Sequence, residues 1–482
     1  MSTSRAARRL GLGFRPSAGT DLAESDWVDA QLVGEFTAPG YARFDGRNTE
    51  IGEWPEALTY SLSDRMDRHK TRVRTILDAE AKQLDSATLA RIRADAWNDY
   101  TVHAQDIHRL AHRGLYGEDQ FRQRLTWFWA NHFTVGRKGD ENIEFIGHYV
   151  DTAIGGALDG SFADMVYGVV THPAMGIYLD NVYNVGENSQ VARICRRDGC
   201  QAGPNDNLGR ELMELHTVSP SRGYTEDDIR NAANILSGWG YPPHPNDRPP
   251  FTPDDWWQSA FFKQRAQPGG KTVLGRDYPE GPAALRRLVD DLSIDASTAD
   301  FLSRKLVLHF IGEAATEDDV AAVREAWTAS DGHLPTVHRA VAERTLEPAA
   351  AGKFVWPIIW LFQAMRISGA DFFYGYEQLN PMEEVVQRRP ERVFEELGFD
   401  FWSVRQPDGY SDRSEAWIST EHFDRRIRFA DLIYRFGNPR LSAAEIADAL
   451  GLSAKTRDMI ATGNTPRDRF VLCLCSKEFM EV

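Results

Sequence analysis

The 482-residue sequence has only four cysteines and no long apolar stretch. The longest apolar run covers nine residues, 354–362, whereas a helix that crosses a membrane needs about twenty. Four cysteines are also too few for a fold held together mainly by disulfides. We therefore expect neither a membrane span nor a disulfide framework.

Positive charge is scarce as well. The 55 Lys and Arg side chains face 71 Asp and Glu, which gives a formal net charge of −16. This charge repels nucleic-acid phosphates, so we expect no nucleic-acid partner. Hydrophobic residues make up 42% of the chain and charged residues 26%, values typical of a globular protein. Collagen-like, coiled-coil and wholly disordered classes are therefore excluded.

Two features concern the compartment. Arg8 and Arg9 suggest a twin-arginine export signal, but no apolar segment follows them, so the sequence favours a cytoplasmic location. Cys195 and Cys200 bracket four residues. We expect two reduced thiols there, and a loop disulfide is the alternative if the protein meets an oxidising compartment.

Helical periodicity dominates the pattern. Apolar residues recur every three or four positions over 87–113, and a second, aromatic helix is expected over 121–133. Capping residues predict further helix starts. These are Thr225, Thr316, Ser442 and Thr465. Strands do not alternate with helices, which excludes a parallel α/β sheet.

We therefore predict a mainly helical, all-α fold in one domain over 1–482. A helical core at 55–350 carries the polar motifs, and a helical portion at 370–482 packs on it. At most one small β-hairpin is expected, near 265–280, and the long loops at 182–206 and 240–281 are expected to be irregular.

Two histidines lie at expected helix ends. His132 ends the segment FWANHF at 128–133. One interpretation is a proton-transfer group with a tuned pKa, because a helix C-terminus raises the pKa of a histidine and burial lowers it. The other is a core histidine that is hydrogen-bonded to a backbone carbonyl. His172 precedes Pro173, which places it at a helix boundary. It either takes part in chemistry or simply caps the helix expected at 161–171.

The segment PNDNLGRELMELHT at 204–217 holds the densest polar cluster. Glu211 and Glu214 are three residues apart and share one helix face. Two carboxylates held partly out of water repel each other, so one can keep a proton near neutral pH and act as a general acid. Arg210 could instead hold either glutamate ionised. A solvated acidic face on a capped surface helix is the alternative interpretation.

The candidates can be grouped by expected role. The catalytic candidates are Glu211, Glu214, His132 and His172, and the substrate-binding candidates are Arg210, Asn181, Asn207 and Trp239. A metal held by the two histidines and one glutamate is a variant. No known metal-binding spacing is present, so we assign no metal ligand and leave the cofactor open. The one-turn pairs His108/His112 and Glu144/His148 are expected on solvent-facing helix surfaces.

Several segments in fixed order resemble a bacterial family. They include RLGLG at 9–13, FWANHF at 128–133, HPAMGIYLDN at 172–181, NDNLGRELMELHT at 205–217, GYTEDDI at 223–229, LSGW at 236–239, GKTVLG at 270–275, QPDGY at 406–410 and LCLCSKEF at 472–479. In this order they resemble domain-of-unknown-function family 1800, over nearly the whole chain. The resemblance implies one mainly helical family domain.

The same resemblance implies less about activity. Members of the family often look exported and often neighbour genes of a sulfatase-like family, which implies processing of an extracellular polymer and a sulfatase-like partner protein. This chain departs from the family at one motif. Before Lys271 the family usually shows His-Asp-x-Gly-x-Lys, whereas residues 266–271 here read AQPGGK and lack the His-Asp pair.

Two hypotheses follow. In the first, the chain is a hydrolase or lyase of a glycan-like or ester substrate, polymeric or small and polar, and the polar candidates meet in one pocket. In the second, it is a non-catalytic helical scaffold or binding partner whose polar motifs form buried structural networks.

Overall fold

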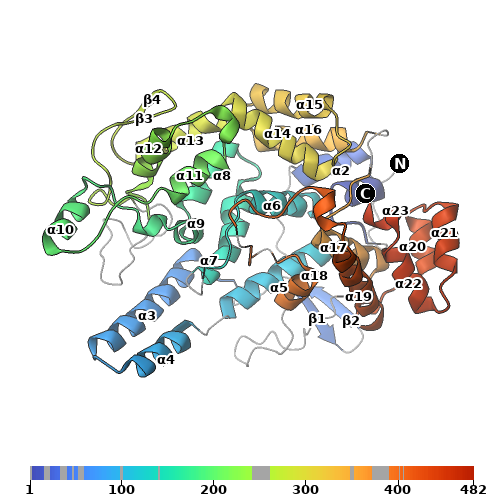
Figure 1. Ribbon diagram of the computed structural model, residues 1–482. Coiled ribbons are helices and arrows are strands. Elements are labelled where there is room, and N and C mark those ends of the chain that lie inside the picture. The colour runs from blue at the N-terminus through green and yellow to red at the C-terminus, as the bar shows by residue number, and fades with distance from the viewer. Residues whose placement is uncertain are drawn as a thin grey trace.

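The computed structural model describes residues 3–15, 22–32, 41–45, 48–52, 59–97, 101–138, 142–240, 261–347, 352–371, 390–400, 402–404 and 406–482. The fold is mainly helical, as the sequence predicts (Figure 1). No helix in these ranges has both the length and the apolar character that crossing a membrane requires.

The N-terminal part contains six α-helices and one β-hairpin among its described residues. They are α1 (Thr3–Arg9), α2 (Glu24–Leu32), β1 (Tyr41–Asp45), β2 (Asn48–Gly52), α3 (Leu62–Ala81), α4 (Ser86–Trp97), α5 (Thr101–Tyr116) and α6 (Gln120–His132). The helix expected over 87–113 is divided between α4 and α5, and residues 98–100 lie outside the described ranges. The hairpin β1–β2 was not predicted from the sequence, which led us to expect at most one hairpin, near 265–280.

The middle part carries the polar motifs. It comprises α7 (Ile143–His148), the π-helix η2 (Tyr149–Ile154), η3 (Gly155–Ala157), α8 (Phe162–Thr171), α9 (Pro173–Tyr178), η4 (Asn181–Tyr183), α10 (Gln190–Asp198), α11 (Asn207–Glu214), η5 (Pro220–Arg222) and α12 (Glu226–Leu236). At one end of the molecule α11 packs against α12 and α9 against α8, and α10 lies further out, apart from these four helices (Figure 1).

The rest of the chain returns to long helices. It comprises β3 (Lys271–Val273), β4 (Arg276–Tyr278), α13 (Ala283–Ser293), α14 (Ala296–Phe310), α15 (Glu317–Ala329), α16 (Leu334–Thr345), α17 (Pro357–Ser368), α18 (Pro390–Leu397), η6 (Ser414–Trp417), α19 (Thr420–Phe436), α20 (Ala443–Ala449), α21 (Ala454–Ala461), α22 (Pro466–Leu474) and α23 (Lys477–Met480).

The expected hairpin near 265–280 is confirmed by β3 and β4, in which Lys271 pairs with Tyr278. Leu274 and Gly275 form its two-residue turn with φ angles of 51° and 76°. Positive φ at both positions is what a tight hairpin turn requires, and glycine adopts it without strain.

One hydrophobic core connects both ends of the chain, from Ala6 to Val482. Every residue of α17 is buried, and Phe362 on this helix packs against Trp127 of α6 with ring centroids 5.3 Å apart. The termini lie close together in Figure 1. Val482 exchanges two backbone hydrogen bonds with Lys353, so the end of the chain is fixed beside the start of α17.

The predicted helix starts are confirmed in atomic detail. Thr225, Thr316, Ser442 and Thr465 each accept a hydrogen bond from the backbone three residues on and form a capping box with an acidic side chain. Each box satisfies backbone N–H groups that the helix itself leaves free, which is why local sequence alone places these starts.

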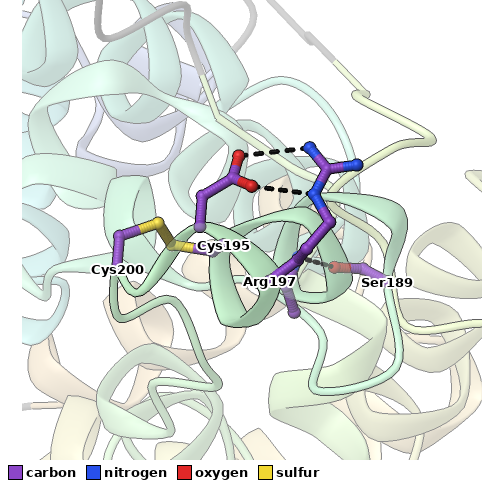
Figure 2. Close-up of a disulfide and its surroundings, with 6 residues drawn as sticks. Ser189, Cys195, Arg197 and Cys200 are labelled. Carbon is purple, nitrogen blue, oxygen red and sulfur yellow. Dashed lines mark hydrogen bonds and ion pairs between the residues drawn. A yellow bond between two sulfur atoms is a disulfide. The ribbon is translucent and has the colours of Figure 1, made fainter.

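The expectation of reduced thiols at Cys195 and Cys200 is wrong, because the two form a disulfide (Figure 2). Their Cα atoms are 4.8 Å apart. Gly199 ends α10 with a φ of 77° and turns the chain back, so that the Cys200 N–H donates to the Cys195 carbonyl oxygen. Figure 2 also shows Ser189, which caps the other end of α10 by accepting from the Ala192 N–H.

The expected solvent-facing surfaces at His108/His112 and Glu144 are also wrong. His112 is fully buried, His108 is 7% exposed and Glu144 is 1% exposed. The Glu144 carboxylate forms ion pairs with Arg68 and Arg72 of α3. The spacing of these residues fitted an exposed helix face, but helices from elsewhere in the sequence cover them: α3 covers Glu144, and α5, which carries His108 and His112, packs against α6, α7, α17 and α18.

Candidate acid–base site

The glutamates of α11 are positioned by close packing of this helix against α12. A Cβ atom on Gly209 would lie only 2.7 Å from the Ala233 backbone nitrogen, so the approach of the two helices requires glycine here. Leu208 and Leu212 are fully buried on the same side. Glu211 lies at the edge of this buried side and is half-buried.

Glu211 is the unusual carboxyl group of this helix. Burial, and secondarily the charge of Glu214, raise its pKa to about 6. Within the described ranges, its carboxylate has no hydrogen-bond or ion-pair partner. The charge of Arg210 lowers the pKa of Glu211, but burial and the charge of Glu214 outweigh it. A carboxyl group that is partly desolvated, beside another acidic group and without a direct ion pair retains a proton close to neutral pH. This is the behaviour that the sequence predicted for one of the two glutamates.

Arg210 does not neutralise this pair. Its guanidinium forms two hydrogen bonds with Glu226, at 2.8 and 3.1 Å, and one with Asp206 at 3.2 Å. These partners hold it in a salt-bridge network at the surface, at the start of α12. The alternative in which Arg210 pairs with Glu211 or Glu214 is therefore not what the structure contains.

Two tyrosines and an aspartate complete the surroundings. Burial raises the pKa of Tyr178 to about 12, and the charges of Glu211 and Asp408 add to the effect. Burial and the Glu214 carboxylate also raise the pKa of Tyr224. We call Glu211, Glu214, Asp408, Tyr178 and Tyr224 the acidic cluster. Tyr178 and Asp408 were missed as site residues, although both lie in segments that carry the family resemblance.

His132 lies behind the acidic cluster and not in it. Its Nε2–H donates to the His216 carbonyl oxygen at 3.1 Å, and its Nδ1 accepts from the Lys305 ammonium at 3.2 Å. The His216 N–H in turn donates to the Glu211 carbonyl oxygen at 2.9 Å. Burial holds the pKa of His132 well below its usual value, so the ring is neutral. His132 thus reaches Glu211 only through the backbone.

His172 serves as a double cap between α8 and α9. It ends α8, and its Nδ1 accepts a hydrogen bond from the Ala174 N–H at 3.1 Å. Nδ1 is therefore unprotonated, and Nε2–H donates to Nδ1 of His148 at 3.1 Å. No hydrogen bond or ring contact joins it to His132, Glu211 or Glu214 within the described ranges. The shared pocket of these four residues is not present.

The metal variant fails for the same reason. Both ring nitrogens of His132 and of His172 already have protein partners. In the part of the chain that the structure describes, no three His, Cys, Asp or Glu side chains are gathered in a way that could hold a metal ion.

The four substrate-binding candidates also separate. Asn181 is 2% exposed, and its amide donates to the carbonyl oxygens of Leu236 and Trp239 at 3.3 and 3.0 Å. Trp239 is 4% exposed and packs edge-on against Tyr167 and Phe261. These two residues therefore have internal roles. Asn207 is exposed at the first turn of α11 and, with Arg210, keeps contact with solvent.

Small hollows lie elsewhere, between α5, α6 and η2. Trp127 and Trp402 line both, with Tyr149 in one and Asp151 in the other. Each has room for about one water molecule, which is too little for a substrate.

The fold is mainly helical, and the polar motifs lie in order along its helices and loops. The family described as protein of unknown function (DUF1800) matches residues 5–480, and the chain belongs to this family. No curated protein matches the chain, and no solved structure does.

Proposed function

We propose that this protein is a hydrolase or lyase of a glycan-like or ester substrate and that Glu211 is its general acid. The observation that carries the proposal is the half-buried Glu211 carboxyl group, whose pKa is raised to about 6 and which has no partner within the described ranges. Perturbed carboxyl groups without a structural partner concentrate at functional sites.

In this proposal the protonated Glu211 donates its proton to the leaving oxygen while the bond from carbon to that oxygen breaks. A second carboxylate, Glu214 or Asp408, takes a proton from the attacking water in hydrolysis, or from the substrate carbon in elimination. Both carboxylates act on Glu211 or its neighbour Tyr178 through their charge. An acidic cluster repels anions, so we expect a neutral, hydroxyl-rich or ester-bearing substrate.

The two tyrosines suit such a substrate. Tyr178 and Tyr224 lie within reach of the charges of Glu211 and Glu214, which add to the effect of burial and raise their pKa values further above neutral, so both hydroxyls are available as donors. An aromatic ring with a hydroxyl group can pack on a sugar face and donate a hydrogen bond to it.

The test is a panel of chromogenic glycosides, p-nitrophenyl esters and neutral polysaccharides, assayed for chromophore release, reducing ends and unsaturated products. Glu211→Gln keeps the size of the side chain and removes its proton transfer, so it should lower turnover by about 100-fold or more. Glu325→Gln, an exposed glutamate on α15, is the matched control and should not alter turnover. Equal rates for both variants would contradict the proposal.

A non-catalytic scaffold is the second candidate. Arg210, His172 and Asn181 all have partners within the protein, as expected for polar networks that fix loops. Failure of the wild-type protein to turn over any member of the panel would favour this candidate. A sulfatase-like partner protein remains a prediction of the family resemblance, to be tested by co-purification with this chain.

A further inference from the structure

Lys305 on α14 has no place in the proposed reaction, yet its surroundings are unusual for a lysine. Its side chain is half-buried, and its ammonium nitrogen lies 3.2 Å from His132 Nδ1 and 5.8 Å from the centroid of the Phe301 ring. Among the described residues, no carboxylate oxygen comes within 4.0 Å of it. A lysine withdrawn from water normally has a carboxylate counter-ion within this distance, and Lys305 is an exception to this rule.

The groups that face Lys305 come from three parts of the chain. His132 at the end of α6 is its hydrogen-bond acceptor. Asp408 and Asp412, in the loop before η6, act on it only through longer-range charge. Burial has the largest effect and lowers the pKa of Lys305 below its usual value. The charges of Asp412 and Asp408 raise this pKa but do not offset burial, which favours the neutral, nucleophilic amine over the ammonium ion.

A second observation is a buried histidine near Lys305 whose ring nitrogens lack hydrogen-bond partners among the described residues. His216 is fully buried, and neither of its ring nitrogens has a hydrogen-bond partner among the described residues. Its ring lies 6.1 Å from that of His132, centroid to centroid. An unpaired buried nitrogen is destabilising, so the described residues leave the site beside Lys305 incompletely satisfied.

We propose that Lys305 is a nucleophilic amine that captures the carbonyl group of an aldehyde or ketone as an imine. The ammonium first loses a proton to solvent, and the neutral amine keeps its hydrogen bond to His132 Nδ1. The amine lone pair then forms a bond to the carbonyl carbon, and the carbonyl oxygen takes a proton to give a carbinolamine. Loss of water by cleavage of the bond from carbon to oxygen leaves the imine, so the amine and the carbonyl compound yield imine and water.

This inference does not depend on Glu211 as a general acid. Asp408 acts through its charge on both Lys305 and Glu211, so the captured compound would lie beside the acidic cluster. The inference would nevertheless hold if Glu211→Gln left all turnover unchanged, and the two proposals can therefore fail separately.

The test is reductive labelling of the full chain with glycolaldehyde and sodium cyanoborohydride, which adds hydride to an imine and traps it as a secondary amine. The labelled protein is digested, and labelling of each lysine is measured by mass spectrometry at about pH 7 and about pH 10. Lys455, exposed on α21, is the internal reference. We expect Lys305 to be labelled roughly tenfold faster than Lys455 at the lower pH, because a larger fraction is neutral, and this advantage to disappear at the higher pH.

Burial limits the access of the labelling reagent to Lys305, so faster labelling of Lys305 than of Lys455 cannot result from greater exposure. A half-buried lysine with an ordinary amine would be labelled more slowly than an exposed one, so labelling at or below the rate of Lys455 at about pH 7 overturns the inference. A Lys305→Arg variant keeps the positive charge and a donor to His132 but cannot form an imine. Its peptide should remain unlabelled while labelling of Lys455 is unchanged.

Discussion

The side chain of Asn131 makes two hydrogen bonds to the backbone of Tyr410. Nδ2 donates to the carbonyl oxygen at 2.8 Å, and Oδ1 accepts from the N–H at 2.7 Å. This pairing ties the end of α6 to the loop that carries Asp408, nearly 280 positions later in the chain. Gly409 permits the contact, because a Cβ atom there would lie 2.4 Å from the Asn131 carbonyl oxygen and its φ is 74°.

Replacement of Asn131 by alanine should therefore release this loop. Two backbone groups of Tyr410 lose their partner, so we expect a loss of about 1–3 kcal/mol in the free energy of unfolding, measured by urea denaturation. Asn207→Ala, at an exposed asparagine, is the control and should change stability by less than about 0.5 kcal/mol. The loop attachment is not important for stability if the two variants unfold alike.

This contact also shows where prediction from sequence ended. Capping boxes, the hairpin turn and the α6 helix depend on residues within a few positions of one another, and all were predicted. The segments around Asn131 and Tyr410 were both recognised as motifs, but their pairing depends on tertiary packing. The expected convergence of His132 and His172 failed for the same reason, since His148 and Lys305 supply partners from other helices. Glu211 combines both kinds of cause: burial, which depends on tertiary packing, has the largest effect on its pKa, and the neighbouring Glu214, which the sequence shows, adds to it.

The raised pKa of Glu211 makes a signed prediction about stability. A carboxyl group whose pKa rises on folding binds its proton more tightly in the native state, so its contribution is present below the unfolded value of 4.5 and is lost as the pH rises through about 6. Glu211→Gln does not ionise. It should therefore gain stability relative to wild type between pH 4.5 and about 6, by no more than about 1 kcal/mol because solvent screens this half-buried group.

Comparison of the two proteins by urea denaturation across this range isolates Glu211 from other titrations, since both share them. Glu325→Gln, at an exposed glutamate, is again the comparison variant. A Glu211→Gln difference that stays constant from pH 4 to pH 8 is incompatible with the raised pKa.

The disulfide predicts a dependence on the compartment in which the chain is made. Disulfides persist in oxidising compartments and are reduced in the cytosol. Protein produced in a bacterial periplasm should therefore have only Cys473 and Cys475 free for alkylation, whereas protein from a reducing cytosol should have all four cysteines free. Intact mass after iodoacetamide treatment distinguishes the two states, and four alkylated cysteines in both preparations would argue against the bond.

The same bond should contribute modestly to stability. It closes a short loop, with a sequence separation of 5, so its removal in Cys195→Ser is expected to lower the free energy of unfolding by about 2 kcal/mol. A serine-to-alanine change such as Ser476→Ala would not be a suitable control, because that serine caps α23. The matched control is the wild-type protein whose disulfide has been reduced. The reduced wild type and the Cys195→Ser variant should unfold at the same urea concentration.

Buried histidines give the opposite pH dependence to Glu211. Burial lowers the pKa of His69, His108, His148 and His309 to about 4 and that of His216 and His338 to about 3. A histidine whose pKa falls on folding binds fewer protons in the native state, so its stabilising effect is lost as the pH drops below the unfolded value of 6.5. At about pH 5.5 each such histidine contributes up to about 1.4 kcal/mol per pH unit, and we expect steep acid unfolding.

His338 offers the sharpest test of this effect. It is fully buried, and its Nε2 accepts a hydrogen bond from the Trp129 indole N–H at 3.0 Å. His338→Gln can keep an acceptor for this donor but does not titrate, so the slope of stability against pH between 6.5 and 5 should fall by about one proton's contribution. The slope should differ from that of wild type even if the variant is less stable at neutral pH, because a packing defect lowers stability equally at every pH whereas a lost titration does not.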